Sequence, residues 1–234
     1  MRIAARTENV PNRIVSDGFA VITDAFGSNE MAVLAEELER SNLPRSKAGI
    51  RHAMRHGGVA ALALDQRLLG VAREVLGRQA LPYRATLFDK SPISNWLVVW
   101  HQDTALPLRE RRETRGWGPW SVKDGVDYAH APAKILEHVL ALRVHLDDST
   151  AANGPLRVLP GTHTLGVLTD EAIHSLSKEI EAVDCPVPHG GVLAMRPLIV
   201  HASSKSRVAN PRRVLHIEYA ASAAVDSGLE LAVA

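Results

Sequence analysis

The chain has 234 residues, of which 46% are hydrophobic and 23% are charged, and its formal net charge is +1. This near-neutral balance excludes a global field that would attract nucleic acid or an anionic membrane. Cys185 is the single cysteine, which excludes an intrachain disulfide and a cysteine-based zinc cluster. The sequence shows no apolar stretch that matches a membrane span or a signal peptide. We therefore predict a cytoplasmic protein whose partners include neither nucleic acid nor a membrane.

The first 80 residues are predicted to be mostly helical, with one early strand. Gly18–Ile22 is short and apolar, which favours a strand. A helix is predicted from Ser28, where apolar residues then recur at helical spacing. A second helix is predicted from about Val59 to Leu76, because apolar residues recur throughout this stretch. These elements are expected to form a helical flank to the rest of the chain.

From Leu81 onward the pattern changes to apolar or alternating segments bounded by Pro, Gly, Asn and Asp, which predicts strands. The predicted strands are Leu81–Phe88, Trp96–Trp100, Ile135–Leu146, Pro155–Leu159, Val192–Val200 and Val214–Ala220. One helix, Thr169–Ile180, interrupts them. No linker divides the chain, so we predict one domain over residues 1–234, with a helical flank (1–80) and an antiparallel β-sandwich or barrel (81–220).

Two of the predicted strands carry one polar face each, because side chains alternate along a strand. The polar faces hold Arg143, His145 and Asp147 in one strand and Arg212, Val214, His216 and Glu218 in the other. A solvated sheet surface would explain this pattern. The alternative is a barrel with a polar interior that holds a charged ligand, its apolar faces being covered by the N-terminal helices.

A candidate metal site begins directly after the strand Trp96–Trp100. His101 and Asp103 point to the same side of an extended chain, so an imidazole and a carboxylate could bind one ion. His201, at the end of the late strand Val192–Val200, is a candidate third ligand. Two histidines and one carboxylate form the facial triad of non-haem Fe(II) oxygenases.

The His-x-Asp spacing alone does not identify the ligands, because the sequence contains it twice. His145 and Asp147 form a second pair, also on a predicted strand and also upstream of His201. The choice between the two pairs depends on their surroundings.

Several blocks occur in the order and places typical of the phytanoyl-CoA dioxygenase family of Fe(II)/2-oxoglutarate oxygenases, which this chain resembles between about Leu81 and Ala220. The blocks are Trp100–Asp103, His145–Asp148, Asn153–His163, His201–Ser203 and Arg212–His216. The resemblance implies a double-stranded β-helix, which is a jelly-roll, cupin-like barrel with flanking helices. It also implies Fe(II), 2-oxoglutarate as co-substrate and dioxygen.

The resemblance selects His101 and Asp103 as the first ligand pair, because in the family this pair precedes the Asn153–His163 block by about one lid loop. His201 is then the third ligand. By the same resemblance, an arginine eleven residues after the last histidine holds the distal carboxylate of 2-oxoglutarate, and that residue is Arg212. Its neighbour Arg213 is the rival, since a register shift of one residue would exchange their faces.

Further site residues are implied by the same resemblance. Lys90 and Ser203 fall where the family has additional co-substrate contacts. The family also has a tryptophan beside the co-substrate, where this chain has Arg143. This departure puts the side contacts of the co-substrate in question, and we assign Arg143 to substrate binding.

The segment Thr104–His130 is a candidate lid. All four tryptophans of the chain fall within 25 residues of one another around the proposed ligands. A long loop without regular structure is usually functional or disordered. We therefore expect a mobile lid in which Trp117 and Trp120 contact the substrate.

Together these features predict a 2-oxoglutarate-dependent dioxygenase that hydroxylates an unactivated C–H bond of a small molecule. Two other classes remain open. One is a cupin-like metal enzyme that does not use 2-oxoglutarate, and the other is a metal-binding or sensing protein without turnover. The sequence does not identify the substrate or the oligomeric state.

Overall fold

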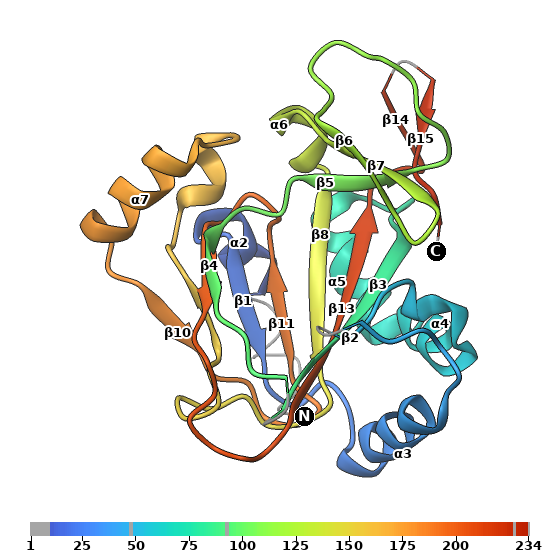
Figure 1. Ribbon diagram of the computed structural model, residues 1–234, viewed down its shortest axis with the longest axis vertical. Helices are drawn as coiled ribbons and strands as arrows, with labels where there is room; N and C mark the ends of the chain where they lie inside the picture. Colours follow the sequence, from blue (N-terminus) through green and yellow to red (C-terminus); the bar gives the residue numbers. More distant parts are fainter. Residues whose placement is uncertain (1–9, 47–48, 92–93, 227, 234) are drawn as a thin grey trace.

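The computed structural model describes residues 10–46, 49–91, 94–226 and 228–233. Two antiparallel β-sheets face each other, and helices cover the outer side of the larger sheet (Figure 1). The first nine residues, on which the expected absence of a signal peptide partly rests, lie outside these ranges. Within them, no helix is long and apolar enough to cross a membrane.

The larger sheet has six strands in the order β1-β11-β8-β13-β3-β2, and every neighbouring pair is antiparallel. The strands are β1 (Phe19–Ile22), β11 (Val192–Met195), β8 (Val139–His145), β13 (Arg212–Ala220), β3 (Leu81–Lys90) and β2 (Gly49–Ile50). The long pairing of β13 with β3 and β8 fixes which side chains of these strands face the interior.

The smaller sheet has four strands in the order β10-β9-β12-β4. They are β10 (Val183–Cys185), β9 (Leu156–Val158), β12 (His201–Ser203) and β4 (Val98–His101). From β3 to β13 the chain passes repeatedly from one sheet to the other, which is the winding of a jelly-roll. The predicted fold class is therefore confirmed.

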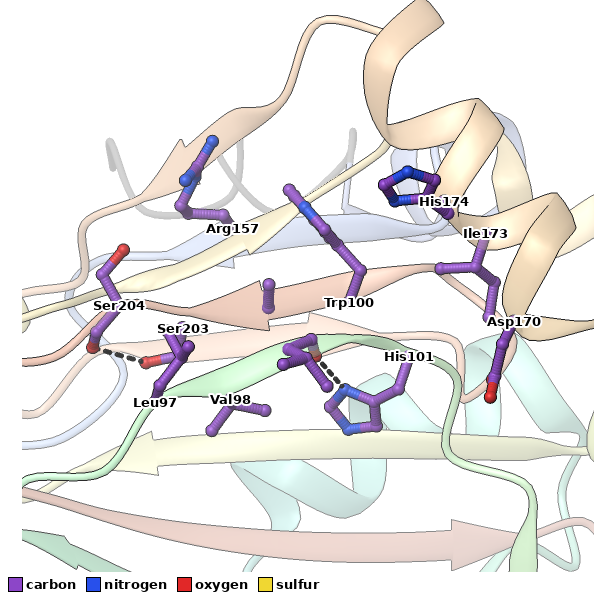
Figure 2. A pocket seen from close by; sticks show the side chains of 12 residues that line it. Leu97, Val98, Trp100, His101, Arg157, Asp170, Ile173, His174, Ser203 and Ser204 are labelled. Carbon is purple, nitrogen blue, oxygen red and sulfur yellow. Dashed lines mark hydrogen bonds between the residues drawn. The ribbon is translucent and has the colours of Figure 1, made fainter.

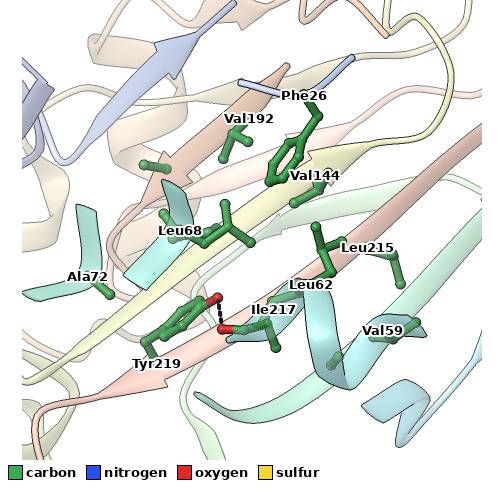
Figure 3. Packing of buried hydrophobic residues seen from close by; sticks show 14 of the residues in the cluster. Phe26, Val59, Leu62, Leu68, Ala72, Val144, Val192, Leu215, Ile217 and Tyr219 are labelled. Atoms are coloured by element: carbon green, nitrogen blue, oxygen red, sulfur yellow. Dashed lines mark hydrogen bonds between the residues drawn. The ribbon is translucent and has the colours of Figure 1, made fainter. Parts of the chain in front are cut away.

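The outer face of the larger sheet is apolar and packs against α3 (Ser28–Arg40), α4 (Gly57–Ala63) and α5 (Gln66–Leu76). Figure 3 shows this core, in which Leu68 and Leu62 of the helices meet Leu215 and Ile217 of β13. Tyr219 joins the same cluster, and its hydroxyl donates a 2.8 Å hydrogen bond to the carbonyl of Ala63. Helix burial thus fixes the register of the sheet.

The inner face of the same strands is polar and buried. Its members include Lys90, Arg143, His145, Arg212, His216 and Glu218, each at most 6% exposed. A solvated sheet surface is excluded for these side chains. The structure instead has the polar barrel interior that was the alternative explanation of the alternating pattern.

The predicted helix Val59–Leu76 is two helices, α4 and α5, which meet at Leu64 and Asp65. The Asp65 side chain accepts a 2.8 Å hydrogen bond from the backbone N–H of Arg67, which caps the start of α5. The apolar content of the segment was predicted correctly, but the cap inside it was missed.

The predicted strand Val192–Val200 is also wrong at its end. β11 stops at Met195, and a turn through Pro197 carries the chain across to the smaller sheet, where β12 begins at His201. Proline cannot donate a hydrogen bond to a sheet, which explains the break. The crossing places His201 beside β4, in the sheet opposite to β11.

The expectation that Thr104–His130 lacks regular structure is wrong. It forms a three-stranded antiparallel sheet in the order β5-β7-β6. The strands are β5 (Ala105–Leu108), β6 (Trp120–Lys123) and β7 (Val126–His130). Figure 1 shows this sheet at one end of the barrel, near the short strands β14 (Ala224–Asp226) and β15 (Leu229–Glu230).

Three further α-helices are α2 (Val10–Ser16), α6 (Ala133–Leu136) and α7 (Asp170–Glu179), and two short 3-10 helices are η1 (Ala53–Arg55) and η2 (Thr162–Leu165). The predicted helix Thr169–Ile180 is confirmed as α7, with the Thr169 side chain accepting from Ala172 N–H at its start. The predicted strand Ile135–Leu146 begins too early, because α6 occupies its first residues and β8 starts at Val139.

Candidate active site

Three side chains that can bind a metal converge where β4 and β12 run side by side. The register pairs His201 directly with His101, and their ring centroids are 4.2 Å apart. Asp103 follows β4. Its Oδ1 lies 3.6 Å from Nε2 of His101, and its Oδ2 lies 3.6 Å from Nε2 of His201. One donor atom from each residue lies within 4.8 Å of the others. This donor set suits a divalent transition metal with open coordination positions.

The backbone orients all three side chains. Nδ1 of His101 lies 2.8 Å from the carbonyl of Val99, and Nδ1 of His201 lies 2.9 Å from that of Ile199. A carbonyl can only accept, so each Nδ1 carries the proton and each Nε2 keeps its lone pair for a metal. The backbone N–H of Asp103 donates to the carbonyl of Pro197 at 2.9 Å, so the turn between β11 and β12 also positions the carboxylate.

The charge states of His201 and Asp103 suit metal binding. Burial opposes the charge of His101, but Asp103 outweighs burial and raises the pKa of that histidine above its ordinary value. Burial lowers the pKa of His201 to about 4, so its ring is neutral at pH 7. Burial disfavours the charge of Asp103, but the two histidines outweigh burial and hold its pKa well below the ordinary value. A neutral imidazole and an ionised carboxylate are the forms that bind metals.

A cavity of about 120 Å³ adjoins the triad and extends to Arg212 and Ser203, behind which the buried cation Lys90 lies. Lys90 Nζ donates to Ser203 Oγ at 3.0 Å and to the carbonyl of Ser204 at 2.6 Å. Arg212 Nη2 donates to the same Ser203 Oγ at 3.2 Å. The three residues that the sequence assigned to the co-substrate therefore meet at one hydroxyl.

The two cations lack a counter-charge. Among the described residues, neither Lys90 nor Arg212 forms an ion pair with a carboxylate, and Nε of Arg212 has no hydrogen-bond partner. Burial, followed by the charge of Arg212, lowers the pKa of Lys90 to about 8. Burial, followed by the charge of Arg143, lowers the pKa of Arg212 to about 10. A buried pair of unpaired cations fits an anionic ligand.

The Asn153–Gly154 turn supports this end of the cavity. Ser203 Oγ donates to the carbonyl of Gly154 at 2.9 Å. Gly154 has a φ of +69°, and a Cβ at this position would lie 2.2 Å from the carbonyl oxygen of Ser204. Glycine is therefore required here, and the turn contributes to the site by holding the serine.

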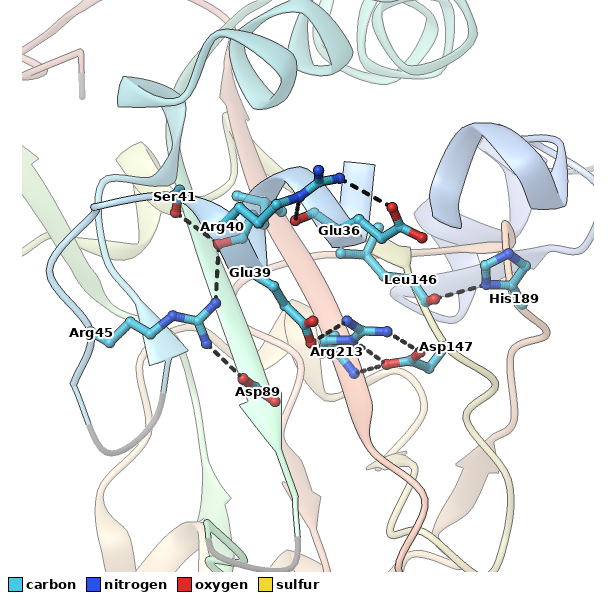
Figure 4. Close-up of polar contacts among 11 residues, drawn as sticks. Glu36, Glu39, Arg40, Ser41, Arg45, Asp89, Leu146, Asp147, His189 and Arg213 are labelled. Atoms are coloured by element: carbon cyan, nitrogen blue, oxygen red, sulfur yellow. Dashed lines mark hydrogen bonds and ion pairs between the residues drawn. The ribbon is translucent and has the colours of Figure 1, made fainter. Parts of the chain in front are cut away.

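Arg213, the rival of Arg212, lies on the opposite face of β13. Its guanidinium forms hydrogen bonds of 2.8 Å with both carboxylate oxygens of Asp147 and a 2.9 Å bond with Glu39 of α3 (Figure 4). Asp147 is thus committed to the outer side of the sheet, whereas His145 lies in the barrel interior. The second His-x-Asp pair is therefore not brought together at a metal site.

His145 is buried, and neither ring nitrogen has a hydrogen-bond partner among the described residues. Burial, followed by the charges of Arg143 and Arg212, holds its pKa well below the ordinary value. A neutral imidazole therefore lies in the barrel wall near the cations.

The tryptophans are divided between several environments. Trp96 lines the cavity, with Lys90 Nζ 5.4 Å from its ring. Trp100 points to the other side of β4 from His101, toward α7, and borders a neighbouring hollow of about 590 Å³ that His101 and Ser203 also line (Figure 2). Trp117 and Trp120 pack in a hydrophobic cluster with Leu106, Leu108, Ala129 and Leu198.

Trp117 is 8% exposed, and its Nε1 donates to Asp226 Oδ2 at 3.2 Å. Neither Trp117 nor Trp120 lines the cavity beside the metal triad, whereas Arg143 does. Of the three residues assigned to substrate binding, the structure thus brings only Arg143 to the triad. A role of the two tryptophans in substrate binding stays a prediction.

A polar network inside the barrel was not predicted from the sequence. Glu218 pairs with Arg84 and accepts a 3.1 Å hydrogen bond from the Tyr83 hydroxyl, and Nε2 of His216 lies 3.7 Å from the same carboxylate. The alternation of β13 put His216 and Glu218 on one face, but the partners of Glu218 on β3, Tyr83 and Arg84, are more than 130 positions away in sequence. Sequence spacing gave no signal for that pairing.

Comparison with known proteins identifies the family. A family profile described as phytanoyl-CoA dioxygenase (PhyH) matches residues 14–214, a range that includes the metal triad and both residues of the cation pair. The chain belongs to this family. The resemblance stated from the sequence motifs is therefore confirmed.

Curated relatives include two small-molecule enzymes. L-proline trans-4-hydroxylase of Streptomyces griseoviridis is 28% identical over 178 residues, which cover 65% of this chain and 59% of that protein. Ectoine dioxygenase of Stutzerimonas stutzeri (strain A1501) is 25% identical over 178 residues, which cover 67% of this chain and 52% of that protein. The PhyH-family chain thus spans somewhat more than half the length of these relatives.

Solved structures show the same fold. EctD from S. alaskensis with 2-oxoglutarate and 5-hydroxyectoine superposes with a TM-score of 0.68 at 22% identity, covering 90% of this chain and 74% of that one. The epimerase SnoN in complex with Fe³⁺, alpha ketoglutarate and nogalamycin RO gives a TM-score of 0.69 at 17% identity, covering 98% and 87%. At these identities the likeness concerns the fold alone.

Proposed function

We propose that this PhyH-family protein is an Fe(II)- and 2-oxoglutarate-dependent dioxygenase that hydroxylates an unactivated C–H bond of a small molecule. The observation that carries the proposal is a cavity lined by the two-histidine, one-carboxylate triad and by Arg212, which shares the Ser203 hydroxyl with a second buried, uncompensated cation, Lys90. A divalent metal suits the triad, and the distal carboxylate of an oxo acid suits the cations.

His101, Asp103 and His201 would hold the iron through two Nε2 atoms and a carboxylate. Arg212 and Lys90, with the hydroxyl of Ser203, would hold the distal carboxylate of 2-oxoglutarate. When bound, iron and 2-oxoglutarate supply the oxidising chemistry with dioxygen, and 2-oxoglutarate leaves as succinate and carbon dioxide. The chain's own contribution is to orient these groups and to bury the distal carboxylate inside the barrel, whereas His101 and Asp103 at the metal end are partly exposed.

The donor set and the burial of Lys90 and Arg212 support this assignment from the chain itself. Both Nε2 atoms are left free by the backbone contacts of Nδ1. The distal-carboxylate site has one neutral hydroxyl between two cations, so a bound anion would remove an unfavourable charge state. A carboxylate of the protein at this place would block that role, and the described residues provide none.

The substrate class is inferred from the relatives. Two curated relatives are named for acting on L-proline and ectoine, which are small molecules. We propose a small-molecule substrate for this chain as well, and a cytoplasmic location. The location is supported by Cys185, the single cysteine, which is buried.

The test is succinate release, measured by mass spectrometry, from protein supplied with Fe(II), 2-oxoglutarate and air, with a panel of amino acids and other small metabolites. Metal- and 2-oxoglutarate-dependent succinate is expected, increased by the true substrate together with a product heavier by one oxygen atom. Metal binding without 2-oxoglutarate binding would instead indicate a cupin-like enzyme of another kind. Binding of both without any succinate would indicate a sensing protein.

A further inference from the structure

Arg143 is a third buried cation in the cavity, and the proposed contacts to the distal carboxylate leave it unused. It lies on β8, is 6% exposed and lines the cavity together with the metal triad and Arg212. Its only hydrogen bond in the described structure runs from Nη1 to Nδ1 of His216, at 2.8 Å. A guanidinium has five N–H donors, so most of its hydrogen-bonding capacity remains available.

The network behind Arg143 holds it in place. Nδ1 of His216 accepts the bond from Arg143, so the ring proton is on Nε2, which lies 3.7 Å from the Glu218 carboxylate. On the other side, the Arg143 guanidinium lies 5.3 Å from the centroid of the Phe88 ring. These contacts orient the guanidinium but do not neutralise it, because no described carboxylate pairs with it.

The strand register places Arg143 at a different level of the barrel from the distal-carboxylate site. Arg212 pairs with Lys90, whereas His216, four residues further along β13, pairs with Arg143. Four residues of strand span about 13 Å. In the facing sheet, Ser203 contacts the Lys90 and Arg212 pair, and His201 is two residues nearer to the level of Arg143. Arg143 is therefore on the metal side of the cavity.

We propose that Arg143 binds the carboxylate at the metal-bound end of the oxo acid, while Arg212 and Lys90 bind its distal carboxylate. This inference rests on the proposed function and adds a specificity-determining residue to it. The two cationic positions then match the two carboxylates of 2-oxoglutarate, one at each end. A cavity of about 120 Å³ has room for one small oxo acid between them.

The contributions of the two carboxylates to binding can be separated by comparing 2-oxoglutarate with 2-oxovalerate. The second acid also has five carbons and the same metal-binding end, but it has no distal carboxylate. Binding of each acid is measured by isothermal titration calorimetry to protein loaded with Ni(II), which avoids turnover. The variants are Arg143→Met, Arg212→Met and, as a matched control, Arg157→Met. Arg157 lies on β9 outside this cavity, where it pairs with Asp184.

Arg143→Met is expected to weaken the binding of both acids by the same factor, on the order of 100-fold, because both acids have the carboxylate at the metal-bound end. Arg212→Met is expected to weaken 2-oxoglutarate alone and to leave 2-oxovalerate unchanged. Arg157→Met should leave both affinities at the wild-type value. Arg143→Lys keeps the charge but not the paired donors, so it should weaken both acids equally and by a smaller factor.

Unchanged affinities of Arg143→Met for both acids would overturn the inference. The earlier assignment of Arg143 to binding of the primary substrate would then stand. Weaker binding of 2-oxoglutarate alone by Arg143→Met would overturn the inference too, since Arg143 would then act at the distal carboxylate. If wild-type protein binds neither acid, the proposed function itself fails. Thermal unfolding of the ligand-free variants checks folding: loss of an unpaired buried charge should leave the melting temperature of Arg143→Met equal to or above that of wild type. Should this variant not fold, Arg143→Lys decides by the same comparison.

Discussion

Lys90 Nζ donates a 3.0 Å hydrogen bond to Ser203 Oγ, which joins the larger sheet to the smaller one inside the barrel. Ser203 in turn donates to the carbonyl of Gly154, so its lone pairs face the two cations, Lys90 and Arg212. A neutral hydroxyl cannot compensate two charges. The arrangement therefore favours binding of an anion, and variants of the two cations test this consequence.

Arg212→Met should raise the Kd for 2-oxoglutarate on the order of 100-fold while Ni(II) or Fe(II) still binds, because one partner of a buried charge pair is removed. Arg213→Met is the matched control, since Arg213 contacts Asp147 and Glu39 on the other face of β13. It should leave the affinity unchanged and lower the melting temperature. Reversed effects at the two arginines would contradict the register of the last strand.

Single alanine substitutions of His101, Asp103 and His201 should each abolish stoichiometric Fe(II) binding, because each removes one of three protein ligands. His145→Ala serves as the control, since His145 lies in the barrel wall and Asp147 pairs with Arg213 on the outer face. Metal content by mass spectrometry after anaerobic loading and desalting gives the readout. Loss of metal in His145→Ala with retention in His101→Ala would show that the wrong His-x-Asp pair was chosen.

The affinity for 2-oxoglutarate should fall as pH rises through about 8. Burial, followed by the charge of Arg212, lowers the pKa of Lys90 to about 8, and an anion binds only the charged form well. Affinity is thus at its maximum below that pH and declines by up to about tenfold per pH unit above it. Lys90→Arg keeps its charge, so its calorimetric Kd should stay flat between pH 7 and 9. If the Kd for 2-oxoglutarate depends on pH in the same way in wild type and in Lys90→Arg, Lys90 does not bind the anion.

Glu218→Gln should destabilise the protein by about 3–5 kcal/mol at pH 7, because Arg84 is left as an unpaired buried charge. Burial opposes the charge of Glu218, but Arg84 outweighs burial and lowers its pKa to about 2, below the ordinary 4.5. This carboxylate therefore contributes stability fully above pH 4.5 and loses the contribution as pH falls toward 2.

The difference in melting temperature between wild type and Glu218→Gln should accordingly narrow below pH 4.5. Glu36→Gln is the control, since Glu36 and its partner Arg40 are exposed, and it should change stability little at any pH. A difference that stays constant from pH 7 to 3 would mean that the Glu218 carboxylate does not stabilise the fold through its charge.

The sequence predicted the fold class and the triad, but for different reasons. Alternation along β8 and β13 placed Arg143, His145, Arg212 and Glu218 on inner faces, and burial confirms this. The choice of His101 over His145 came from the order of motifs in the family. Spacing could not show that Pro197 ends β11 or that Arg84 pairs with Glu218, because both depend on how distant strands cross between sheets.

The segment Thr104–His130 shows a further limit. Its charged residues suggested a loop, yet apolar residues between them are buried under the three-stranded sheet, including Leu106, Leu108 and Trp117. Short strands of four or five residues have too few positions for alternation to be distinguished from a polar loop.

The position of Trp117 leads to the last prediction: Trp117→Ala should lower stability by about 3–5 kcal/mol, because it opens a cavity in the cluster under the three-stranded sheet. Trp117→Phe keeps most of the packing but loses the 3.2 Å hydrogen bond to Asp226, so its loss of stability should be smaller than that of Trp117→Ala. Trp120→Phe is the control, since Nε1 of Trp120 has no hydrogen-bond partner among the described residues. Chemical denaturation measures the three changes. If Trp117→Ala instead unfolds like wild type and impairs only product formation, Trp117 contacts substrate and the segment is a lid, because removal of a core side chain cannot leave the free energy of unfolding unchanged.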